Sequence, residues 1–177
     1  MESLIEQQHN QEEGTNVRKF LARRGAVLVR ETRDTGSVSG IYRDVLLIST
    51  SVLAIVKKLH KDMSYGVRIE RQDSEEKTES SVYLDYDELS ELVDAFDFIR
   101  DSAIEMAKHE RDYTEVTYSS KDNAKIGFFL QNGKLQYFVA LESRRETCFL
   151  KDNAFQQLKE MILKAKNHLI SCGASVV

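Results

Sequence analysis

Proline is absent from the 177-residue sequence, so no residue of that kind interrupts a strand or a helix. The only two cysteines, Cys148 and Cys172, are too few for a disulfide framework and indicate a reduced, cytoplasmic setting. The longest apolar run, residues 45–56, is broken by residues 49–51 and falls short of the roughly 20 residues that cross a bilayer. We therefore expect a cytoplasmic protein that does not enter a membrane.

Catalytic and cofactor motifs are also missing. The eight glycines lie mainly at turns and form no phosphate-binding loop, and no G-x-S-x-G or H-E-x-x-H segment occurs. The four histidines are scattered along the chain and are not grouped with cysteines as metal ligands. We expect a protein that is not an enzyme and that has no metal site and no small-molecule cofactor.

Charge is distributed unevenly along the chain. Residues 1–16 contain four glutamates and no lysine or arginine, and they have little apolar content, so we expect a disordered acidic tail followed by one globular domain at 17–177. Residues 17–61 contain ten basic and three acidic side chains, whereas residues 62–112 contain sixteen acidic and six basic ones. Such polarised charge attracts a charged partner, or belongs to ordinary solvated faces.

Two segments carry the apolar spacing of an amphipathic helix, from residue 86 to about 108 and from residue 153 to about 171. A shift of 66 positions, which carries Leu89 onto Phe155, superimposes all five apolar positions of one segment on those of the other. The residues just before each helix also match, since Val82 to Leu84 fall on Cys148 to Leu150. The sequence therefore predicts two pseudo-repeats, at about 26–110 and 113–171.

Four strand-like segments precede each helix, so the predicted order is ββββα followed by ββββα. The fold class is α+β, with two tandem units whose antiparallel sheets pack with two amphipathic helices. The register of the fourteen-residue segment 44–57 is open, since this segment fits one strand with a bulge or two strands. The predicted strands are 26–32, 44–57, 65–71 and 81–84 in the first unit, and 114–119, 125–131, 134–142 and 147–150 in the second.

Turn and capping residues mark the element boundaries. Asn132-Gly133 is a favoured two-residue hairpin turn, and the segment 34–36, Asp-Thr-Gly, predicts a chain reversal. Asp85 followed by Glu88 predicts a capping box at the first long helix. Asp152 is the expected cap of the second.

The predicted hairpin around Asn132-Gly133 has two distinct faces if Gln131 pairs with Lys134. The first is apolar and should face the core: Ile126, Phe128, Leu130, Leu135, Tyr137, Val139 and Leu141. The second sets two aromatic rings among polar side chains: Lys125, Phe129, Lys134, Gln136, Phe138 and Ala140. That second face suits base stacking, or is covered by a partner strand, a second layer or another subunit.

Two tandem ββββα units of this length resemble the Whirly family of single-stranded-DNA-binding proteins, over residues 26 to the C-terminus. Two segments, 65–68 and 83–88, also resemble bacterial proteins of unknown function. The first resemblance implies single-stranded DNA or RNA as a partner, with bases stacking on the sheet while cations follow the phosphates, and a homo-oligomer. The implied binding residues are Phe129, Phe138, Lys125, Lys134, Arg30, Arg33 and Arg43. The competing hypothesis is a non-catalytic module for protein interaction or homo-oligomerisation.

Overall fold

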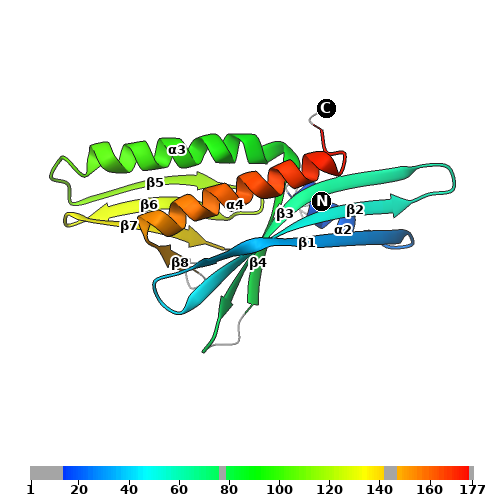
Figure 1. Cartoon of the computed structure of the whole chain (residues 1–177), viewed down its shortest axis with the longest axis horizontal. Helices are drawn as coiled ribbons and strands as arrows, with labels where there is room; N and C mark the ends of the chain where they lie inside the picture. Colours follow the sequence, from blue (N-terminus) through cyan, green and yellow to red (C-terminus); the bar gives the residue numbers. More distant parts are fainter. Residues whose placement is uncertain (1–13, 76–78, 142–146, 176–177) are drawn as a thin grey trace, which may run out of the picture.

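The computed structural model describes residues 14–75, 79–141 and 147–175. The predicted order ββββα–ββββα is confirmed (Figure 1). Each group of four strands forms an antiparallel sheet whose strands pair in chain order. Sheet A consists of β1 (Val27–Ser39), β2 (Asp44–Val56), β3 (Lys61–Asp73) and β4 (Glu79–Asp85), and sheet B of β5 (Tyr113–Ser119), β6 (Lys125–Gln131), β7 (Lys134–Ala140) and β8 (Thr147–Leu150). A short 3-10 turn (Tyr86–Glu88) leads into α3 (Leu89–Met106), and α4 (Asp152–Ser171) follows β8.

Both long helices bury the five matched apolar positions that the sequence singled out. In α3 these begin with Leu89 and Leu92, and in α4 with Phe155 and Leu158. The helices cross over between the units, because α3 packs on β5 and β6 while α4 packs mainly on β1, β2 and β3. Figure 1 shows α3 running along sheet B and α4 crossing diagonally onto sheet A. Each unit's helix therefore covers the other unit's sheet, and the two units share one hydrophobic core.

The β6–β7 hairpin has the predicted register. Gln131 pairs with Lys134, and Asn132 and Gly133 both take positive φ, at 50° and 73°, as a type I′ turn requires. Six of the seven predicted core residues on this hairpin are buried. Leu135 is the exception, with 38% of its surface exposed, because it lies next to the turn at the end of the sheet.

The predicted reversal at residues 34–36 is wrong. β1 runs straight through this segment to Ser39, with a bulge between Asp34 and Gly36. The chain reverses instead at residues 40–43, where Arg43 takes a left-handed φ of 54°. The segment 44–57, whose register the sequence left open, forms one strand, β2, which pairs without irregularity with β3.

A short helix, α2 (Asn16–Leu21), packs on the face of sheet A that the long helices leave open, over β2, β3 and β4. Val17 is fully buried there against Leu53 and Tyr83. Thr15 is also buried, and its side chain accepts a hydrogen bond from the Arg18 N–H as the N-cap. The end of the predicted tail is thus corrected, because its last residues belong to the fold; residues 1–13 lie outside the described part.

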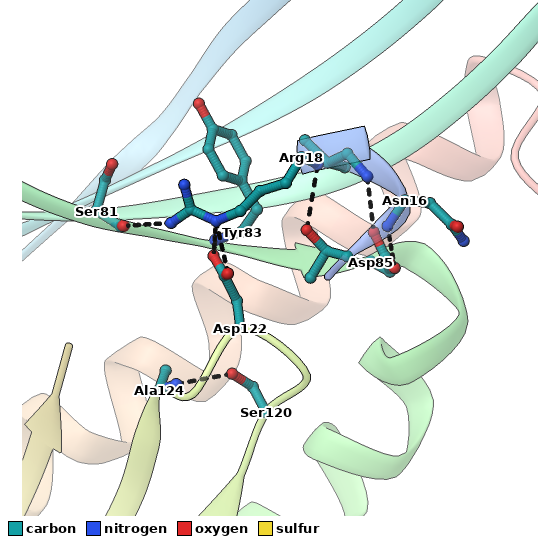
Figure 2. Close-up of polar contacts among 10 residues, drawn as sticks. Asn16, Arg18, Ser81, Tyr83, Asp85, Ser120, Asp122 and Ala124 are labelled. Atoms are coloured by element: carbon teal, nitrogen blue, oxygen red, sulfur yellow. Dashed lines mark hydrogen bonds and ion pairs between the residues drawn. The ribbon is translucent and has the colours of Figure 1, made fainter. Parts of the chain in front are cut away.

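Asp85 does not form the predicted capping box. Its carboxylate accepts hydrogen bonds from the backbone N–H groups of Asn16, at 2.8 Å, and Val17, at 3.1 Å (Figure 2). Its side chain makes no cap bond to its own helix. Asp85 therefore fixes α2, which is distant in sequence, at the end of β4.

The turn between β5 and β6 also holds α2. Figure 2 shows Arg18 reaching from α2 to Asp122, whose two carboxylate oxygens lie 2.5 and 2.7 Å from Nε. Asp122 also accepts the backbone N–H of Tyr83 at 2.8 Å, which satisfies a donor on the free edge of β4. Ser120 shapes this turn by accepting the Ala124 N–H. The second unit thus anchors the helix that covers the first.

The predicted cap of α4 is also corrected. Asp152 is the first helical residue, and Lys151 occupies the N-cap position without making a side-chain cap bond. The Asp152 carboxylate instead pairs with the Arg100 guanidinium of α3, at 3.1 Å. This ion pair links the two long helices.

Candidate nucleic-acid interface

The outer face of sheet B, away from the long helices, carries a connected set of aromatic rings. Phe129 of β6 lies at the centre, 6.0 Å from Phe138, 6.3 Å from Phe149 and 6.3 Å from Tyr113 between ring centroids. Tyr42, from the β1–β2 loop, lies 6.0 Å from Phe149. We call these five residues the aromatic row. It spans from an edge strand of sheet B to a loop of the first unit.

The rings differ in how far solvent reaches them. Tyr42 and Tyr113, at the two ends, are 68% and 54% exposed, and Phe129 and Phe149 are half-buried. Phe138 is only 7% exposed, so it supports its neighbours and offers little ring surface of its own. The surface available for stacking is therefore longer than the two predicted phenylalanines.

Sequence analysis missed three members of the row. Tyr113 and Phe149 share the face of Phe129 because alternate residues of paired strands point to one side, a signal present in the sequence. Tyr42 had no such signal, since it comes from the other unit. The backbone of its neighbour Ile41 donates a hydrogen bond to the Phe149 carbonyl at 2.8 Å, which holds the loop against β8.

Gly127 lies in β6 between Thr117 and Phe138 of the neighbouring strands. A Cβ atom added at this glycine would overlap the Val116 carbonyl oxygen. Only glycine therefore allows β5 to approach β6 this closely.

Cationic side chains flank the aromatic row. Lys125 and Lys134 are exposed on the same face of β6 and β7. Arg43 follows Tyr42 and donates to Glu75 at 2.6 Å. Glu115 carries a negative charge on the same face, and its carboxylate accepts the Tyr113 hydroxyl at 2.6 Å. The face thus combines stacking surface with positive charge, which is opposed by the carboxylates of Glu115 and, at Arg43, of Glu75.

The structure does not bring the other two predicted arginines to this face. Arg30 lies on the outer face of sheet A, where it donates to the Tyr83 hydroxyl at 3.2 Å. Arg33 points to the opposite side of β1, 3.3 Å from His168 of α4. Of the predicted binding residues, Phe129, Phe138, Lys125, Lys134 and Arg43 share one region, and the two β1 arginines lie elsewhere.

A second polar cluster lies where α2, β4 and α3 meet. Glu88 is only 4% exposed, and its carboxylate oxygens have no hydrogen-bond partner of standard geometry in the described part. Burial, and then the negative charge of Asp85, raises the pKa of Glu88 from 4.5 to about 7. Burial also raises the pKa of Asp85 and, with Glu88 nearby, that of Tyr118 to about 12. Lys121 lies close by, 3.8 Å from Asp85.

Neither this cluster nor any other within residues 14–75, 79–141 and 147–175 groups three side chains suited to hold a metal ion. Burial raises the pKa of the Cys148 thiol, and the negative charge of the nearby Asp44 carboxylate raises it further. That thiol therefore stays protonated at neutral pH. The second cysteine, Cys172, is exposed beyond the end of α4.

Comparisons of the chain with protein-family models, with curated proteins and with solved structures find no match. No helix in the part of the chain that the structure describes is long and apolar enough to span a membrane.

Proposed function

We propose that the protein binds single-stranded nucleic acid on the outer face of sheet B. The observation that carries this proposal is the aromatic row with Lys125 and Lys134 beside it. Every base has a flat π face, so a row of rings binds single strands with little dependence on sequence. Four-stranded sheets with aromatic side chains on one face bind RNA in the same way.

The proposed mechanism divides the work between rings and cations. Bases stack on Tyr113, Phe129, Phe149 and Tyr42, while Lys125 and Lys134 neutralise phosphates. The acidic helix α3 lies on the opposite side of sheet B, so its carboxylates, among them Glu91, Asp94 and Asp101, do not face the bound strand. Binding is thereby confined to the sheet face.

Fluorescence anisotropy with a labelled oligothymidylate, at low and at moderate salt, tests the proposal. We expect saturable binding that weakens as salt is raised, with a log–log slope of about −1 to −2 if two lysines contact phosphates. No binding at low salt would overturn the proposal.

Aromatic variants test the site itself. Tyr113→Ala combined with Phe129→Ala should weaken binding by about tenfold or more, because each stacked base contributes about 1–3 kcal/mol. Phe98→Ala is the matched control, since Phe98 is an exposed aromatic on α3, on the far side of sheet B. Equal loss in both variants, or unchanged binding in the first, would reject the outer face as the site.

The competing function is a protein-interaction module that uses the same rings. An apolar protein contact changes little with salt, whereas binding to phosphates weakens steeply. A protein complex that is lost in Tyr113→Ala with Phe129→Ala, together with no oligonucleotide binding, would favour the module.

A further inference from the structure

β1 is an edge strand of sheet A, and its outer edge pairs with no strand among the described residues. It is thirteen residues long, and residues 29–34 are all exposed. A long free edge presents unpaired backbone N–H and C=O groups and readily adds another strand. The partner that such an edge accepts is decided by its side chains.

Four charged residues follow one another on this edge around Thr32: Arg30, Glu31, Arg33 and Asp34. None of the four forms an ion pair with a carboxylate or a cation in the described part of the chain. Arg30 lies on the outer face of sheet A, where it contacts Tyr83, and Arg33 lies on the helix side, where it contacts His168. Because side chains alternate along a strand, Asp34 shares the face of Arg30 and Glu31 shares that of Arg33.

The order of these charges is complementary to itself in the antiparallel sense. If two copies of β1 pair about a two-fold axis at Thr32, Arg30 faces Asp34 of the other copy and Glu31 faces its Arg33. All four charges then have opposite partners, twice over, on both faces of the sheet. A two-fold axis at any of the four charged residues would set that residue against its own copy. An axis at Val29 or Thr35 would match none of the four with one another.

We propose that two copies of this chain pair antiparallel through β1, with the two-fold axis at Thr32, to form one continuous eight-stranded sheet. Isologous pairing of this kind uses the same edge on both subunits. The bulge at Asp34/Gly36 limits regular pairing to the segment around Thr32, so the strand contact is short and depends on the charge match. This surface is separate from the aromatic row, and the inference does not rest on nucleic-acid binding.

Sedimentation velocity of the full chain, from low micromolar to near-millimolar concentration, tests the dimer. Arg33→Glu leaves two acidic side chains, at positions 31 and 33, facing each other across the axis, and Glu31→Arg leaves two basic ones there. Each variant should weaken the dimer by about tenfold or more, because attractive pairs become repulsive ones. The double exchange, Glu31→Arg with Arg33→Glu, restores opposite charges and should restore the dimer.

Mixing the two single variants gives a sharper result. One chain then carries only acidic and the other only basic side chains at positions 31 and 33, so a heterodimer should form where neither variant pairs with itself. We expect both variants to keep the circular-dichroism spectrum of the natural chain, because positions 31 and 33 are exposed.

A cross-link tests the register. Thr32→Cys, in a Cys172→Ser background, should oxidise rapidly to a disulfide dimer, since the two copies of residue 32 face each other across the axis. Ser37→Cys is the control, because its two copies would lie far apart along the strands. A chain that stays monomeric at every concentration, a dimer that survives Arg33→Glu, or equal cross-linking in both cysteine variants would overturn the proposal.

Discussion

Sheets A and B have the same strand order, yet their outer faces differ. On sheet A, α2 packs on the outer face over β2, β3 and β4, where Val17 lies against Leu53 and Tyr83. On sheet B the outer face carries the aromatic row, with tyrosines exposed at both ends. The inner faces of the two sheets, by contrast, share one core with the two long helices. The repeated unit thus accounts for the shared core, whereas the outer faces of the two sheets differ in the side chains and helices that lie on them.

The sheets also differ in length. β1, β2 and β3 have thirteen residues each, whereas β5, β6 and β7 have seven. Figure 1 shows the three long strands continuing past the last turn of α4. Exposed apolar residues lie on this extension, among them Val27, Val56 and Leu59. Sheet A therefore offers a long edge that pairs with no strand of the described residues, while sheet B offers a face.

The largest expected effect is a loss of stability, and it distinguishes the inner face of sheet B from the outer face at two neighbouring residues. Phe128 is fully buried on the inner face, and Phe129 is half-buried on the outer one. Phe128→Ala should lower the free energy of unfolding by about 3–5 kcal/mol, since it leaves a cavity in the core. Phe129→Ala should cost clearly less. Urea denaturation measures both, and equal losses would mean that the outer face is as much a part of the core as the inner one.

The buried carboxylate at the junction of the two sheets should make stability depend on pH. Because the pKa of Glu88 is raised from 4.5 to about 7, the folded state holds this proton more tightly than the unfolded chain does. Its contribution is therefore fully present below about pH 4.5 and is lost as the pH rises through about 7. That loss is on the order of 3 kcal/mol.

Glu88→Gln should remove this loss, because the amide is never ionised. Urea denaturation at pH 5 and pH 8 compares it with the natural chain, and Glu91→Gln, an exposed site in the first turn of α3, serves as the control. A natural chain that is as stable at pH 8 as the Gln variant would show that Glu88 ionises there without cost.

Helix α2 should become less stable when Asp122, which holds it from the second unit, is replaced. Asp122→Ala leaves both the Arg18 guanidinium and the Tyr83 N–H without this acceptor, at a cost of about 2 kcal/mol. Hydrogen exchange of the α2 amides should accelerate more than exchange in α3. Asp94→Ala, an exposed carboxylate on α3, is the control and should leave both rates unchanged.

The smallest effect concerns the charge that opposes the lysines on sheet B. Glu115→Gln removes that carboxylate but keeps a hydrogen-bond acceptor for the Tyr113 hydroxyl. We expect oligonucleotide binding to tighten about two- to threefold, and stability to change by less than about 0.5 kcal/mol. Anisotropy titrations at low salt measure the binding, and weaker binding by the variant would argue against phosphates lying near this residue.

Local patterns predicted the repeated elements because each pattern depends only on residues near one another in the chain. The spacing of Leu89, Leu92 and Phe96 specifies a helix face, and Asn132-Gly133 specifies a two-residue turn, whatever the rest of the chain does. The predicted pairing of Gln131 with Lys134 followed from that turn alone.

The wrong predictions came from residues whose partners are distant in sequence. Asp-Thr-Gly at 34–36 has turn chemistry, but pairing with β2 and the packing of Met161 of α4 against Gly36 keep the strand going. Asp85 has capping chemistry, but burial beside α2 gives it other donors. A six-residue helix such as α2 is marginal by itself, so nothing local announces it.

By itself, the sequence determined the two ββββα units and the buried face of each long helix, because strand and helix periodicities are local properties of the chain. Tertiary structure alone decided that each long helix covers the other unit's sheet and that α2 covers one outer face. It also joined Tyr42 to the rings of sheet B. These contacts join residues far apart in the chain, and they form only when the folded core brings those residues together.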